Sequence, residues 1–116
     1  MITIFTSDDA GAPVLSGQVG TLIPVLDACL INGYGAKVGM GWTKDFSGTN
    51  LAAYRAPAGN RFYLRVDDTN AQYPQFNGYR TMSGISTGTG LFPSAVQLAG
   101  GIKGVKSSTA SAAARL

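Results

Sequence analysis

The stretch Arg61-Phe62-Tyr63-Leu64-Arg65-Val66-Asp67-Asp68 carries the clearest structural pattern in this chain. Apolar residues alternate in it with charged residues and a tyrosine. The first set is Phe62, Leu64 and Val66, and the second is Arg61, Tyr63, Arg65 and Asp67. Alternation with a period of two predicts a half-buried β-strand, with one face packed and the other facing water or a partner.

On the N-terminal side of this strand, turn-forming residues separate further short strands. Gly48-Thr49-Asn50 separates two strand-like runs and predicts a hairpin, and Pro57–Asn60 turns the chain into the central stretch. The two runs are Gly41–Ser47 and Leu51–Ala56. We therefore expect a three-stranded antiparallel meander, with the opening segment Met1–Phe5 as a strand at its end.

One helix is predicted over residues 21–31. Thr21 is placed to cap its N-terminus, Pro24 falls in its first turn, and Asn32-Gly33 ends it. Apolar residues recur at intervals of three and four and form a stripe that must pack on the sheet. The stripe is Leu22, Val25, Leu26, Cys29 and Leu30, with Asp27 on the side facing water.

The rest of the chain predicts short elements and loops. We expect an exposed loop over 71–77, a strand over 78–83, a flexible loop over 84–90, one or two helical turns over 93–98 and a last strand over 102–106. The predicted fold class is α+β, a small antiparallel sheet or meander packed against one helix, with Gly-rich loops. Residues 1–106 form the single domain, and 107–116 are expected to be a flexible C-terminal tail.

Composition limits the classes of partner and compartment. Only 13% of the 116 residues are charged, 16 are glycine, and the net charge is +3 with no histidine. The basic residues are scattered, so no nucleic-acid or membrane partner is expected. No apolar run is long enough to span a bilayer. Cys29 alone supports no disulfide framework and fits a protein that folds in the cytosol.

The sequence contains no recognisable catalytic or metal-binding constellation. Without histidine there is no Ser/His/Asp or Cys/His arrangement, so we expect no enzyme, cofactor or metal. Asp67 and Asp68 predict the end of a strand and a capped turn, with a cation site shared with Asp8 and Asp9 as the alternative. Gly84–Gly90 lacks the Lys-Ser/Thr ending of a phosphate-binding loop and is interpreted as a contact segment.

Arginine and tyrosine side chains on neighbouring strands predict a partner-binding surface. Tyr63 lies between Arg61 and Arg65, and Tyr54 and Arg55 lie on the adjacent strand. Arg and Tyr are enriched at protein interfaces. An ordinary solvated face, with Arg stems covering Tyr, explains the same pattern. The surface could also stack bases or sugars.

Three segments resemble a family of tailed-bacteriophage virion structural proteins. They are Val25–Gly35 (VLDACLINGYG), Gly41–Asn50 (GWTKDFSGTN) and Asn60–Asp68 (NRFYLRVDD). The similarity extends over most of the chain, through Pro93. Some members of the family are longer and continue beyond the position where this chain ends, and none provides catalytic residues to carry over.

The resemblance implies a capsid decoration or cement protein that binds the outside of the major capsid lattice. Its expected partners are the major capsid protein or other virion subunits, in a homo-oligomeric assembly located in the virion. The alternative is a tail or fibre-associated module that contacts host glycan or another tail subunit. Its candidate aromatic residues are Trp42, Tyr54, Tyr73 and Tyr79.

Overall fold

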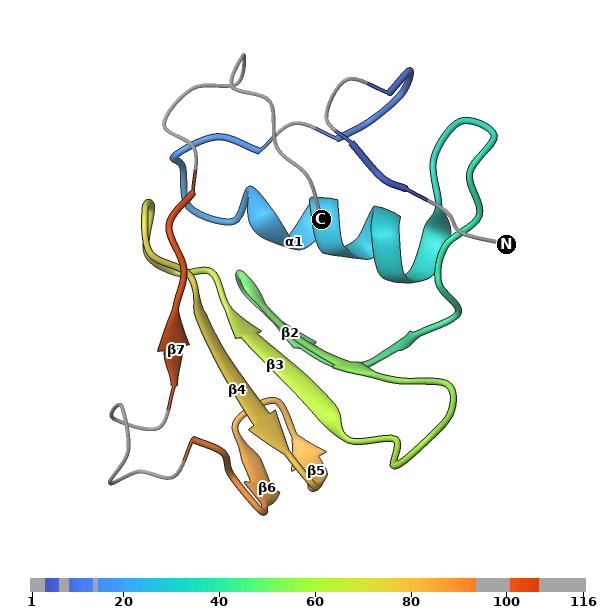
Figure 1. Ribbon diagram of the computed structural model, residues 1–116. Helices are drawn as coiled ribbons and strands as arrows, with labels where there is room; N and C mark the ends of the chain where they lie inside the picture. Colours follow the sequence, from blue (N-terminus) through green and yellow to red (C-terminus); the bar gives the residue numbers. More distant parts are fainter. Residues whose placement is uncertain (1–3, 7–8, 14, 94–100, 107–116) are drawn as a thin grey trace.

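A computed structural model describes residues 4–6, 9–13, 15–93 and 101–106. It confirms a small α+β fold in which a helical segment crosses one face of an antiparallel sheet (Figure 1). The elements are α1 (Leu22–Leu26), the π-helix η1 (Asp27–Asn32), β1 (Thr43–Gly48), β2 (Leu51–Arg55), β3 (Tyr63–Asp67), β4 (Gln75–Tyr79), β5 (Thr81–Gly84), β6 (Thr87–Thr89) and β7 (Ile102–Lys103). The main sheet has the order β1-β2-β3-β4-β7, and β5 and β6 form a separate hairpin.

The first face of the main sheet, the helix face, carries the larger hydrophobic core. Ala52, Tyr54 and Val66 are fully buried there and pack with Leu22 and Leu30 of the helical segment. Their positions follow the pairing of β2 with β3, in which Tyr54 lies opposite Leu64 and Ala52 opposite Val66. Leu64 and Val66 therefore face the helix, as the alternation predicts.

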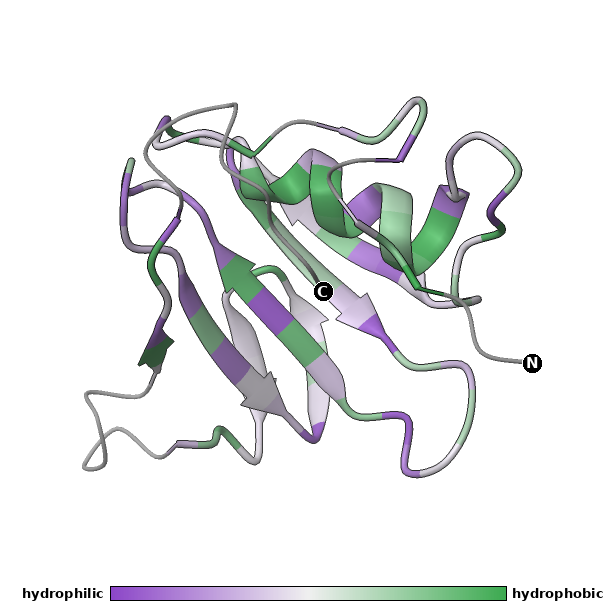
Figure 2. Cartoon of the chain, turned by 45° about the horizontal axis from the view of Figure 1, so that its top comes forward, coloured by the Kyte–Doolittle hydropathy of each residue, from purple (hydrophilic) through white to green (hydrophobic). Residues whose placement is uncertain are grey.

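The opposite face, the hairpin face, is also covered, so the prediction that this face meets water or a partner was wrong. Tyr63 lies on it beside Ala53 and packs against Met82 of β5. Phe46, Tyr79 and Ile85 surround this second cluster. Hydrophobic and hydrophilic residues alternate along the central strands in Figure 2. The second cluster forms because the β5–β6 hairpin folds back over residues that the strand pattern alone assigns to the outside.

The helical segment runs over residues 22–32, close to its predicted span, but its ends differ from the prediction. The Thr21 hydroxyl donates back to the Ser16 carbonyl at 2.6 Å and makes no side-chain cap. The backbone N–H of Leu22 instead donates to the Asp68 carboxylate at 2.8 Å. At the other end, Gly33 adopts a φ of 72°, a left-handed conformation that suits glycine and stops the helix.

The second half of this segment is a π-helix, and its first residue, Asp27, contacts the sheet. The Tyr54 hydroxyl donates to Asp27 at 2.8 Å, and the Lys44 ammonium lies 2.9 Å from it. Asp27 therefore links η1 to β1 and β2, where the sequence predicted a residue facing water. Burial and this hydrogen bond both raise the pKa of Tyr54.

Several predicted boundaries were wrong. Of the predicted strand Met1–Phe5, residues 1–3 lie outside the described residues, and Ile4 and Phe5 belong to neither sheet. The strand β3 begins at Tyr63 because Arg61 has a φ of 54°, and the last strand covers only two residues. The loops predicted over 71–77 and 84–90 contribute residues to β4 and β6. Of the helical turns predicted over 93–98, all but residue 93 lie outside the described residues. The predicted tail, 107–116, lies wholly outside them.

A polar cluster holds the N-terminal segment against the chain that follows the helix. The Tyr34 hydroxyl donates to Asp9 at 2.6 Å, and Lys37 forms an ion pair with the same carboxylate and bonds the Ile4 carbonyl. The Lys37 hydrogen bond, with smaller effects from Tyr34 and Thr6, holds the pKa of Asp9 well below its usual range. Desolvation, together with the bond to Asp9, raises the pKa of Tyr34 to about 12.

Candidate functional site: an aromatic groove

The candidate site is an apolar depression of about 340 Å³, here called the aromatic groove. This volume lies within the range of ligand-binding pockets. The groove is formed by strands β3, β4 and β7, together with the residue before β1, the β2–β3 loop and the segment that follows β6. Its lining residues are Trp42, Ala56, Asn60, Phe62, Tyr63, Leu64, Phe76, Asn77, Gly78, Phe92, Pro93 and Ile102. All of them are uncharged.

Phe92 closes onto β4 through a close approach that only glycine permits. The backbones of Gly78 and Phe92 form an antiparallel bridge, with N–H to carbonyl distances of 2.8 and 2.9 Å. A Cβ at position 78 would overlap the Phe92 ring. The ring in turn lies 6.1 Å from that of Phe62. The small residue in β4 therefore makes room for one aromatic wall of the groove.

The groove is open to the surface on one side. Phe92 is 48% exposed and Ile102 is 54% exposed, whereas Trp42 and Phe62 are half-buried. Exposed apolar side chains gathered around a depression mark sites of protein or ligand contact. The groove can thus accept apolar side chains or rings, and it supplies few polar groups to hold them.

The predicted Arg/Tyr surface is not assembled as expected. Tyr54 is fully buried in the helix face, with no exposed area, and Tyr63 is buried on the hairpin face. The two tyrosines lie on opposite faces because they occupy adjacent rows of the strand register, and successive residues of a strand point to opposite faces. Neither therefore forms the exposed Arg/Tyr strand face that the sequence predicted.

The three arginines of that prediction have different surroundings. Arg61 is exposed, and Arg55 is half-buried, with its guanidinium carbon 5.0 Å from the centre of the Tyr63 ring. Arg65 donates to the Ile85 carbonyl at 2.6 Å and to the Ser86 hydroxyl at 3.1 Å. Arg65 therefore binds the β5–β6 hairpin to the sheet, and only Arg55 and Arg61 remain near the surface.

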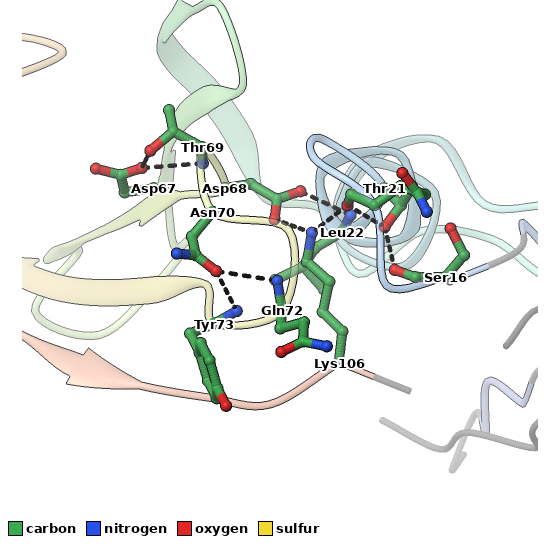
Figure 3. A network of polar contacts seen from close by, with 11 residues as sticks. Ser16, Thr21, Leu22, Asp67, Asp68, Thr69, Asn70, Gln72, Tyr73 and Lys106 are labelled. Atoms are coloured by element: carbon green, nitrogen blue, oxygen red, sulfur yellow. Dashed lines mark hydrogen bonds and ion pairs between the residues drawn. The ribbon is translucent and has the colours of Figure 1, made fainter. Parts of the chain in front are cut away.

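Asp67 and Asp68 have structural partners at the end of the strand, and only Asp67 caps the following turn as predicted. Asp67 accepts hydrogen bonds from the backbone and hydroxyl of Thr69, at 3.1 and 2.6 Å, and so caps the following turn. Asp68 is fully buried, where it caps the helix and forms an ion pair with Lys106 (Figure 3). The alternative of a shared cation site is not supported, because Asp9 is bonded to Tyr34 and Lys37 and Asp8 lies outside the described residues.

The aromatic residues proposed for glycan binding do not share one surface. Trp42 lines the groove and Tyr73 is 48% exposed, whereas Tyr54 is buried and Tyr79 packs under the hairpin. Phe92 was missed as a site residue. The only sequence signal for it is a phenylalanine between a Gly-rich run and a proline, a pattern common to many loops.

No family model, curated protein or solved structure matches the chain. Among the described residues, no helix is long and apolar enough to cross a membrane. Within the same ranges, no three His, Cys, Asp or Glu side chains gather in a way that could hold a metal ion.

Proposed function

We propose that this chain is a structural protein of a tailed-bacteriophage virion, a capsid decoration or cement protein that binds the outside of the major capsid lattice. The observation that carries the proposal is the aromatic groove, an uncharged depression bordered by exposed Phe92 and Ile102. The resemblance of three segments to virion structural proteins provides the biological setting. The partners are the major capsid protein or other virion subunits, and the protein acts as repeated copies in the virion.

Small contacts are sufficient for this role because they are repeated. A groove of this size buries too little surface for one isolated contact to be tight. Copies joined in one lattice bind with far higher overall avidity than each contact alone. A decoration protein can therefore rely on a small apolar groove of this kind.

Purified particles test the proposal. The protein should be present at a copy number comparable to that of the capsid subunits, and electron cryomicroscopy should place it on the outer shell. Ile102→Asp should lower its incorporation because a carboxylate would enter the groove, and Val38→Asp is the matched control at an exposed site outside the groove lining. Absence from the head, or only a few copies per particle, would refute the cement role.

A tail or fibre-associated module that binds glycan is the second candidate. Trp42, Phe62 and Asn60 line the same groove, and aromatic rings beside an amide can bind the apolar face and hydroxyls of a sugar. Glycan-array binding that is lost in Trp42→Ala, together with location on the tail, would favour this candidate over cement.

A further inference from the structure

Three arginines, Arg55, Arg61 and Arg80, lie at the end of the main sheet that the aromatic groove reaches. In the strand register, Arg55 of β2 lies opposite Tyr63 of β3, and Tyr63 lies opposite Tyr79 of β4. These residues form one row across the end of the sheet. Arg61 precedes this row in the chain and Arg80 follows it. Two of these arginines are sequence neighbours of residues that line the groove. Ala56 follows Arg55, and Asn60 and Phe62 flank Arg61.

Arg55 lies against Tyr63 on the hairpin face, so Arg61 and Arg80 are the arginines beside the groove. Arg55 Nε donates to the Arg61 carbonyl at 3.2 Å. The Arg80 backbone donates to Thr89, and its side chain lies over Gly90, two residues before Phe92. The same two segments, β4 with Arg80 and the residues after β6, also form the bridge between Gly78 and Phe92. Arg61 precedes Phe62 in the chain and Arg80 lies against the segment that leads to Phe92, so positive charge borders the two aromatic walls of the groove.

None of these three arginines is in an ion pair with a carboxylate within the described ranges, where the ion pairs involve Lys37, Lys44, Arg65 and Lys106. Arg61 and Arg80 are exposed. Lys103 adjoins Ile102, but successive residues of a strand point to opposite faces, so its side chain leaves the groove face. The site thus combines an uncharged apolar depression with positive charge concentrated at one end.

We propose that the groove binds an extended peptide segment of a partner protein whose apolar side chains fill the depression and whose carboxylate meets Arg61 and Arg80. The carboxylate is an Asp or Glu side chain or the C-terminus of the segment. This inference deepens the proposed function, because it names the chemistry of the subunit segment that the groove takes. Arginine guanidinium groups bind carboxylates with charge-assisted hydrogen bonds.

The geometry favours a peptide over single-stranded nucleic acid. The Phe62 and Phe92 rings are inclined at 53°, so they make angled walls and not a stack of parallel platforms. The arginines gather at one end and do not track along the groove, as a phosphate backbone requires. Charge at one end and apolar surface beyond it are complementary to an apolar segment with an acidic end.

Trp42 provides a direct readout, because it lines the groove and is the only tryptophan of the chain. Its fluorescence is measured while the full-length protein is titrated with three sets of short peptides. The sets share apolar cores of Leu, Val, Pro and Phe and end in Asp-Asp, Ser-Ser or Lys-Lys. Oligothymidylate is titrated in parallel. We expect the acidic set to bind most tightly and to weaken as salt increases.

Charge variants locate the acidic end. Arg61→Gln and Arg80→Gln should each weaken binding of the acidic peptides by about tenfold, since each removes a charge-assisted hydrogen bond. Neutral peptides should bind these variants and the wild type equally. Lys103→Gln, the control, should change neither. Unchanged thermal midpoints establish that the arginine variants remain folded.

Three outcomes would overturn the inference. They are equal binding of acidic and basic peptides, tighter binding of oligothymidylate, and no response of Trp42 to any peptide set. Each differs from a failure of the cement role, which is decided by the copy number and position of the protein on particles. A protein found on the tail that still selects acidic peptides would refute the cement role and retain the inference.

Discussion

Lys106 and Asp68 form a buried ion pair that ties the chain after β7 to the start of the helix. Their side chains are 1% and 0% exposed. One Asp68 oxygen accepts the Leu22 N–H at 2.8 Å, and the other faces Lys106 and accepts no further hydrogen bond in the described part of the chain. Lys106 also donates to the Gln18 carbonyl at 2.6 Å. Three distant segments thus meet at one carboxylate (Figure 3).

Lys106→Met should therefore destabilise the fold strongly. Removing one partner leaves the Asp68 carboxylate buried without its counter-charge, at a cost of about 3–5 kcal/mol. Urea denaturation followed by circular dichroism measures the loss in free energy of unfolding. Lys103→Met, at an exposed cation on the same segment, should change it by less than about 0.5 kcal/mol. Equal effects of the two variants would show that the ion pair has no special role.

Arg65→Ala should weaken the fold itself. From the sequence, Arg65 is expected on the outer face, where its loss would affect assembly more than stability. In the structure its side chain is 14% exposed and donates to the Ile85 carbonyl and the Ser86 hydroxyl. Losing these bonds should cost about 1–3 kcal/mol and loosen the β5–β6 hairpin. Hydrogen exchange of the Thr81–Thr89 amides measures this loosening, and unchanged protection would contradict the assignment.

Gly78→Ala should displace Phe92 from the groove wall. The added Cβ would overlap the Phe92 ring, and overpacking of this kind costs about 1–3 kcal/mol. The variant should be less stable and should have altered Trp42 fluorescence. Gly84→Ala is the matched control, because a Cβ there would meet only an ordinary contact with Thr87. A variant with wild-type stability and fluorescence would show that the ring does not lie against position 78.

Tyr34 should contribute a stability that is lost at alkaline pH. Its pKa is raised from 10.0 to about 12 in the folded protein, first by desolvation and then by its bond to Asp9. A group whose folded pKa is raised contributes fully below its unfolded pKa and loses that contribution as pH rises between the two values. Thermal midpoints of wild type and Tyr34→Phe should therefore converge between about pH 10 and 12. A constant difference across this interval would exclude the linkage.

Much of the central architecture was predictable from local patterns. The β1–β2 hairpin was expected from Gly48-Thr49-Asn50, and Asn50 indeed has a φ of 58°, a conformation that asparagine tolerates in turns. The helical stripe correctly assigned Leu22, Cys29 and Leu30 to the core. These predictions succeed because backbone conformation and the period of apolar residues are encoded within a few consecutive positions.

The sequence by itself therefore determined the α+β class, a helix predicted over residues 21–31 and found over 22–32, and the inward side of β3. Only the tertiary structure decided that the other side of β3 is also buried, that Asp68 caps the helix, and that Phe92 meets Phe62 at the groove. Each of these contacts joins segments far apart in the chain. Local periodicity cannot specify them, because whether a polar or aromatic side chain faces water depends on which distant segment packs over it.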